Sequence, residues 1–181
     1  MATVTADEFR AATTRFAREA RPGVVRTGRY RLGYRAWGSG PPVVFVHGMA
    51  DVGRSFVMVM ARLCDRFTTI EYDLPDGLTD GSAIGRYTHR DYVADLLALL
   101  DHLGAARAAV VGSSFGSTIT LAALAAAPHR FTHGGLQGGF ARRPLAWWQH
   151  LLAQNIRFWP GYQGDWPVIH DTIMGRVEGS L

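Results

Sequence analysis

The chain of 181 residues has a hydrophobic share of 48% and a charged share of 19%, which excludes a disordered protein and is enough for one domain with a buried core. The formal net charge is +4, and every one of the 19 basic residues is an arginine, scattered along the chain. This distribution argues against a nucleic-acid surface, and the lack of any long uncharged apolar run predicts no membrane span.

The N-terminal segment and the single cysteine bear on the compartment. Residues 6–20 carry several charges and therefore lack the apolar core of a signal peptide. Cys64 cannot form an internal disulfide, and its apolar surroundings in the sequence are typical of a buried, unreactive thiol. We therefore expect a cytoplasmic protein.

The first 40 residues predict a helix and then a pair of strands. Residues 6–20 place Phe9 and Phe16 on one helical face, and Pro22-Gly23 is expected to end that helix. The pattern leaves open whether the helix docks on the domain or moves freely. The strand pair is expected around residues 28–37, before a segment rich in glycine and proline.

The following hundred residues alternate strands with helices. Apolar runs predict strands at residues 43–46, 67–72 and 108–111, with a weaker strand at 132–137. Helical patterns cover residues 55–64, 88–103 and 115–127, of which 88–103 is the clearest because Gly104 supplies a stop. The alternation predicts an α/β domain with a mostly parallel sheet flanked by helices.

The motif Gly112-Ser113-Ser114-Phe115-Gly116 fits G-x-S-x-G between a predicted strand and a predicted helix. A sharp turn there strains the serine backbone and projects its hydroxyl into open space. The strand and the helix then pass so close to each other that only small residues fit at positions 112 and 116, where this chain has glycine. The motif makes Ser114 a candidate nucleophile; the alternative is a glycine-rich turn with an idle serine.

The segment His47-Gly48-Met49 follows the predicted strand at residues 43–46. Hydrolysis of an acyl compound passes through an oxyanion that two backbone N–H groups can stabilise. The expected donors are the amides of Met49 and Phe115, and Gly48 would let the backbone approach the site. Taken alone, His47-Gly48 is also compatible with an ordinary turn.

In this order and spacing, residues 28–140 resemble the α/β-hydrolase fold family, with 67 residues between His47 and Ser114. The resemblance implies a central parallel sheet, Ser114 as nucleophile, an oxyanion hole made by Met49 and Phe115, and a structural His47. It divides the chain into an N-terminal helical extension (1–24), an incomplete hydrolase core (25–140) and the start of a helical cap (141–181).

Two departures from the family pattern stand out. The loop at residues 73–82 lacks the arginine of the common Asp-x-Arg-Gly-x-Gly-x-Ser pattern, which leaves subfamily and substrate open. The triad acid and histidine should follow Ser114 on later strands, yet no strand is predicted after residue 137. We therefore expect missing C-terminal strands, a truncated chain of weak or no activity, and an open sheet edge that associates with a partner or with itself.

Aromatic residues gather in the expected cap. The group includes Trp147, Trp148 and Trp159. In the family an insertion at this place covers the active site, so these rings are candidates to line an apolar acyl pocket. The alternative is that they only pack the cap helices on the sheet.

The sequence thus predicts a serine hydrolase that cleaves an ester, amide or related acyl bond through an acyl-enzyme at Ser114. Without a phosphate-binding loop or metal-ligand spacing, no cofactor and no metal are expected. One alternative is a non-catalytic, maspardin-like binding or adaptor protein. Another is acyl transfer, carbon–carbon bond hydrolysis or cofactor-free peroxidation on the same fold. Dehalogenases and epoxide hydrolases of this fold use an aspartate where Ser114 stands, which argues against both.

Overall fold

The computed structural model describes residues 4–49, 51–75 and 87–139 of the chain. The chain divides into two units, Met1–Ala141 and Arg142–Leu181, and every described residue belongs to the first. Residues 76–82 of the unusual loop lie outside the described residues, as does the expected cap with Trp147, Trp148 and Trp159.

The described residues form a six-stranded sheet in the order β1-β2-β4-β3-β5-β6. Strands β4, β3, β5 and β6 run parallel, and the hairpin of β1 and β2 joins β4 in antiparallel orientation. The mostly parallel sheet expected from the sequence is thereby confirmed, while the missing C-terminal strands stay a prediction. The strands are β1 (Arg21–Arg26), β2 (Arg31–Trp37), β3 (Pro42–Val46), β4 (Thr68–Tyr72), β5 (Ala108–Ser113) and β6 (Phe131–Gln137).

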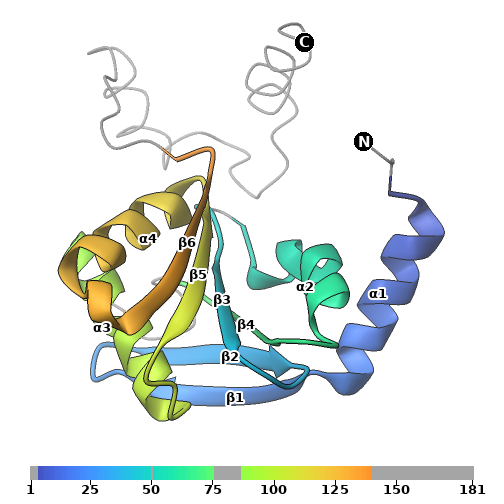
Figure 1. Cartoon of the computed structure of the whole chain (residues 1–181), viewed down its shortest axis with the longest axis horizontal. Coiled ribbons are helices and arrows are strands. Elements are labelled where there is room, and N and C mark those ends of the chain that lie inside the picture. The colour runs from blue at the N-terminus through green and yellow to red at the C-terminus, as the bar shows by residue number, and fades with distance from the viewer. Residues whose placement is uncertain (1–3, 50, 76–86, 140–181) are drawn as a thin grey trace, which may run out of the picture. The chain divides into compact units, whose positions relative to one another are not determined.

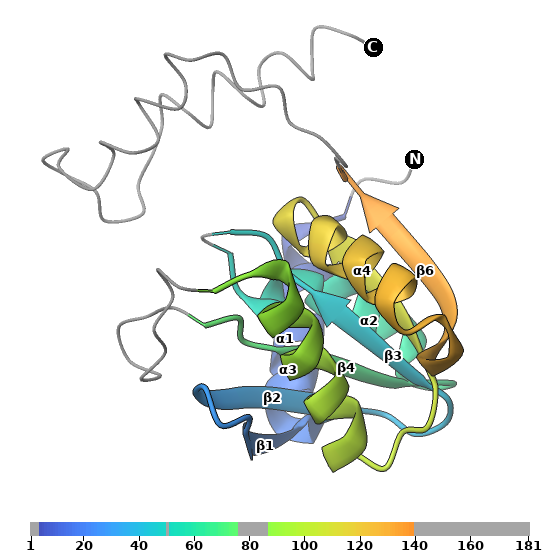
Figure 2. The same ribbon diagram turned by 90° about the vertical axis from the view of Figure 1, so that its left-hand side faces the viewer.

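Helices cover both faces of this sheet. Helices α3 (His89–His102) and α4 (Phe115–Ala126) lie on one face, and α1 (Ala6–Glu19) and α2 (Val57–Leu63) lie on the other (Figure 1). The view turned by 90° in Figure 2 places α3 and α4 in front of the sheet and the other pair behind it. Short 3-10 turns, Gly53–Phe56 and Pro128–Arg130, precede α2 and β6.

Strand β3 explains why its sequence is wholly apolar. Val44 and Val46 belong to the core beneath α3 and α4, whereas Val43 and Phe45 belong to the core beneath α1 and α2. Successive side chains of a strand point to opposite faces, so a strand covered on both faces has no polar side. All four side chains are buried.

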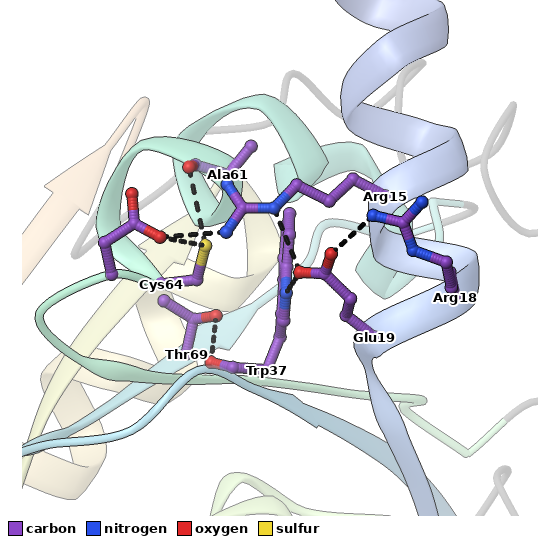
Figure 3. Close-up of polar contacts among 8 residues, drawn as sticks. Arg15, Arg18, Glu19, Trp37, Ala61, Cys64 and Thr69 are labelled. Atoms are coloured by element: carbon purple, nitrogen blue, oxygen red, sulfur yellow. Dashed lines mark hydrogen bonds and ion pairs between the residues drawn. The ribbon is translucent and has the colours of Figure 1, made fainter.

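Helix α1 docks on the domain and does not move freely. Its Phe16 is 2% exposed and meets the Trp37 ring edge-on at 5.5 Å. Figure 3 shows the Glu19 carboxylate between two arginines and the Trp37 indole, which donates from Nε1 at 3.1 Å. The hydrogen bond from Arg18, with those from Trp37 and Arg15, lowers the pKa of Glu19 to about 2. Packing and charge thus fix the end of α1 beside β2.

The prediction for the strand pair was wrong at its start. Helix α1 already ends at Glu19, and Pro22-Gly23 lies inside β1. An edge strand tolerates Pro22 because its missing N–H need not join the ladder. A Cβ on Gly23 would lie 2.3 Å from the end of the Tyr34 ring, so a larger residue there would force that ring to move.

The clearest predicted helix is confirmed with its stop signals. Thr88 and Asp91 form a capping box at the start of α3, and Gly104 follows its end with a φ of +66°.

Cys64 is buried, as expected from the sequence, and burial raises the pKa of its thiol. Among the described helices none is long and apolar enough to cross a membrane.

Candidate active site

Ser114 stands at the junction of β5 and α4. Its backbone has φ 51° and ψ −116°, and it is the one non-glycine residue with positive φ among those described. Such a conformation costs about 1–3 kcal/mol and persists only when the surroundings hold it. The residue is exposed, as expected for a serine that a strained turn projects from the sheet.

Two glycines allow the close approach of chain segments around Ser114. A Cβ on Gly112 would lie 2.3 Å from the carbonyl oxygen of Gly116, and one on Gly116 would lie 2.1 Å from that of Val46. These obstacles are backbone atoms, which cannot rotate away. Only glycine therefore fits where β3, β5 and the start of α4 meet.

The loop after β3 lies directly against the serine. A Cβ on Gly48 would be 3.3 Å from Ser114 Cβ and 3.8 Å from Ser114 Oγ. The next residue, Met49, keeps its side chain 75% exposed. The structure thus brings Gly48 and the elbow together, and Met49 follows immediately, at the edge where the parallel strands β3 and β5 end.

His47 ties two loops together. Its Nε2 accepts the N–H of Leu74 at 3.0 Å, so its Nδ1 carries the proton and donates to the carbonyl of Gly48 at 2.7 Å. The ring is 6% exposed. Because both nitrogens are engaged, this imidazole holds the loop after β3 against the loop after β4.

Phe115, the first residue of α4, is held by rings from α3. The Tyr92 ring meets it edge-on at 5.4 Å, and the His89 ring lies at 5.9 Å. His89 Nε2 also lies 3.2 Å from the Thr118 hydroxyl, which donates to the Phe115 carbonyl at 2.7 Å. Neither ring was expected here from the sequence, because no pattern along the chain shows that α3 and α4 lie side by side.

None of the described histidines is hydrogen-bonded to Ser114, and His129 lies in the 3-10 turn before β6, beyond the far end of α4 from Ser114. His47 and His89 form the hydrogen bonds given above, and His102 lies 3.3 Å from the Tyr34 hydroxyl. His133 is paired in register with Ala109, at the opposite end of β5 from Ser113. Within the described ranges there is also no group of three or more potential metal ligands.

Comparison of the sequence with known proteins identifies a matching family and a similar enzyme. A sequence model described as alpha/beta hydrolase fold matches residues 41–169. The 2-(acetamidomethylene)succinate hydrolase of Mesorhizobium japonicum is 39% identical over 105 residues, which cover 58% of this chain and 37% of that protein. The chain thus spans well under half the length of this curated relative.

Solved structures agree with the sequence match. The structure of E-2-(acetamidomethylene)succinate hydrolase is similar with a TM-score of 0.64 and 29% identity, over 77% of this chain and 51% of that one. The naproxen esterase of Bacillus subtilis reaches a TM-score of 0.66 at 17% identity, over 86% of this chain and 58% of that one, and shows the fold alone.

Proposed function

The chain belongs to the alpha/beta hydrolase fold family, and from this premise we propose that it is a serine hydrolase acting on an ester, amide or related acyl bond. The observation that carries the proposal is the strained backbone of Ser114, an exposed residue at the strand-to-helix turn, with Gly48 directly against it. A bystander serine would gain nothing from such a conformation, whereas a nucleophile gains an accessible hydroxyl.

The chemistry proceeds through an acyl-enzyme. Ser114 Oγ attacks the acyl carbonyl, and its proton passes to a general base. The N–H groups of Met49 and Phe115 stabilise the oxyanion, and the N-terminal end of α4 adds its partial positive charge. Collapse of the intermediate breaks the bond to the leaving group, which takes up the proton. Water then cleaves the acyl-enzyme by the same steps.

The general base must come from outside the described residues, because none of the described histidines bonds to Ser114. In this family the acid and the histidine follow the serine along the chain. A protein lacking that base would retain only the share of the rate supplied by the oxyanion hole and by binding. We propose no cofactor for the reaction.

The first substrate to test comes from the curated relative. Because that relative is named 2-(acetamidomethylene)succinate hydrolase, we propose a small acyl substrate of the amide class, with simple p-nitrophenyl esters as general reporters. The aromatic residues Trp147, Trp148 and Trp159 remain proposed lining residues of an acyl pocket.

A non-catalytic binding or adaptor role is the second candidate. It is favoured by one observation: no described side chain activates Ser114. The exposed edge strand β6 supports a related proposal, association with a partner or with a second copy. Light scattering after size-exclusion chromatography tests that association, and a monodisperse monomer contradicts it.

Covalent labelling tests the catalytic proposal. A fluorophosphonate probe should label the protein, and Ser114→Ala should abolish both labelling and hydrolysis of the substrates named above. The neighbouring Ser113→Ala is the matched control and should label normally. Absence of labelling in the unaltered protein, with partner or ligand binding retained by Ser114→Ala, would favour the binding role.

A further inference from the structure

The strained backbone of Ser114 is held from the end of β6. The Ser114 N–H donates to the carbonyl oxygen of Gln137 at 2.8 Å. Gln137 is the last residue of β6 and is paired in register with Ser113. A conformation that costs free energy needs such contacts, because they prevent the backbone from relaxing. The position of the Gln137 carbonyl therefore bears directly on the geometry of Ser114.

A second serine holds this same carbonyl. Ser117 lies in the first turn of α4 with 1% of its surface exposed. Its hydroxyl is 2.8 Å from the carbonyl oxygen of Gln137 and 2.7 Å from that of Gly112, and its single proton serves both. The Ser117 N–H also donates to the Ser114 carbonyl at 3.0 Å. Ser117 thus connects Gly112 at the end of β5, Gln137 at the end of β6, and Ser114.

The end of β6 is held by its ladder with β5 and by these contacts with Ser114 and Ser117. In the described sheet β6 is an edge strand, and its residues after Phe131 are mostly exposed. Gly138 then turns the chain with a φ of +60°, and a Cβ on Gly139 would lie 3.0 Å from Ser117 Cβ. The chain leaves the sheet directly over Ser117, so the buried hydroxyl adds a side-chain contact to the Gln137 carbonyl that the ladder with β5 brings beside Ser114.

We propose that Ser117 is a positioning residue for the nucleophile, an inference that rests on the proposed function. Its hydroxyl fixes the Gln137 carbonyl, which accepts the Ser114 N–H and keeps the serine backbone in its strained conformation. Ser117 is too deeply buried to meet a substrate, so its effect falls on the reactivity of Ser114 and not on binding.

Replacement of Ser117 tests the proposal. In Ser117→Ala the rate of fluorophosphonate labelling at Ser114 and kcat should both fall roughly tenfold, the effect of one lost hydrogen bond, with KM nearly unchanged. The Ser114 amide should exchange its hydrogen faster. Ser117→Cys retains a weak hydrogen-bond donor, so its labelling rate should lie between those of the unaltered protein and Ser117→Ala. This variant keeps the test decisive if the alanine variant does not fold.

Thr120→Val is the matched control. Thr120 lies one turn further along α4, is fully buried, and its hydroxyl has no hydrogen-bond partner among the described residues. The isosteric change should leave labelling and amide exchange unaltered. Labelling and exchange of Ser117→Ala equal to those of the unaltered protein would overturn the inference. Activity that survives Ser114→Ala would overturn the proposed function instead, and amide exchange would still decide the role of Ser117.

Discussion

Gly48 and Ser114 face each other at the proposed site, at a distance that leaves little room for a side chain on Gly48. A methyl group on Gly48 would lie 3.3 Å from Ser114 Cβ and 3.8 Å from its Oγ. The 3.3 Å contact is tighter than ordinary van der Waals packing, so one partner would have to shift by a few tenths of an ångström, whereas the 3.8 Å contact is an ordinary one. Small displacements at a reacting centre are costly, because catalysis depends on alignment.

Gly48→Ala should therefore lower activity more than stability. We expect the labelling rate at Ser114 to fall about 10- to 100-fold, while the free energy of unfolding changes by less than ~1 kcal/mol. Gly104→Ala provides the contrast: its φ is +66° with no atom within 4 Å, so it should cost about 1 kcal/mol without affecting labelling. Equal labelling by the two variants would contradict the closeness of Gly48 to the nucleophile.

Gly116→Ala should destabilise the whole fold. The added Cβ would lie 2.1 Å from the carbonyl oxygen of Val46 and 2.6 Å from that of His47, both backbone atoms at the end of β3. We expect a loss of more than ~3 kcal/mol in urea unfolding, or no folded protein.

Gly134→Ala is the matched control for this clash. Its Cβ would meet the end of the Leu124 side chain at 2.4 Å, and that side chain can rotate away. The expected cost is about 1 kcal/mol. Similar losses for both variants would show that backbone contact is not what makes Gly116 necessary.

The docking of α1 should depend on the C-terminal half of its apolar face, because Phe16 there is buried whereas Phe9, on the same face two turns earlier, is exposed. Phe16→Ala removes a ring that is 2% exposed and packed on Trp37, and should cost about 3–4 kcal/mol. Phe9→Ala, in the same helix with 51% exposure, should change stability by less than about 0.5 kcal/mol. Urea unfolding followed by far-UV circular dichroism measures both. A small effect of Phe16→Ala would mean that charges alone hold the helix.

Glu71 should make stability fall as the pH rises. It is fully buried on β4, where Arg35 donates to Oε1 at 2.9 Å and Oε2 has no hydrogen-bond partner among the described residues. Burial raises the pKa of Glu71 above its ordinary 4.5, against the opposing hydrogen bond from Arg35. The folded protein then binds this proton more tightly than the unfolded chain, so the stabilisation is present below pH 4.5 and is lost as pH rises through the folded pKa.

Glu71→Gln isolates that contribution, since the amide oxygen can still accept from Arg35. The free energy of unfolding of the unaltered protein, relative to the variant, should decrease as the pH rises above 4.5. The difference between the two proteins cancels the opposite slopes of carboxyls with lowered pKa values, such as Asp91 beside Thr88. A difference that is constant with pH would show that Glu71 titrates normally.

Much of the fold could be predicted from the sequence, because the signals depend on residues that are close together in the chain. The apolar run of β3, the stop at Gly104 and the motif around Ser114 each depend on neighbouring residues, so a pattern along the chain can reveal them. The family resemblance at residues 28–140 followed from their order, and the match over residues 41–169 supports it. The cytoplasmic location, the domain limits and the catalytic roles stay predictions.

What the sequence alone determined was the kind of domain and the position of the serine at the strand-to-helix turn, because strand, turn and helix signals are local. Only the tertiary structure decided that α1 docks through Phe16, that Tyr92 supports Phe115, and that Ser117 joins the ends of β5 and β6. These contacts link segments that are far apart in the chain or depend on how α4 faces the sheet. Such proximity is set by how the helices pack on the two faces, and no short-range pattern encodes it.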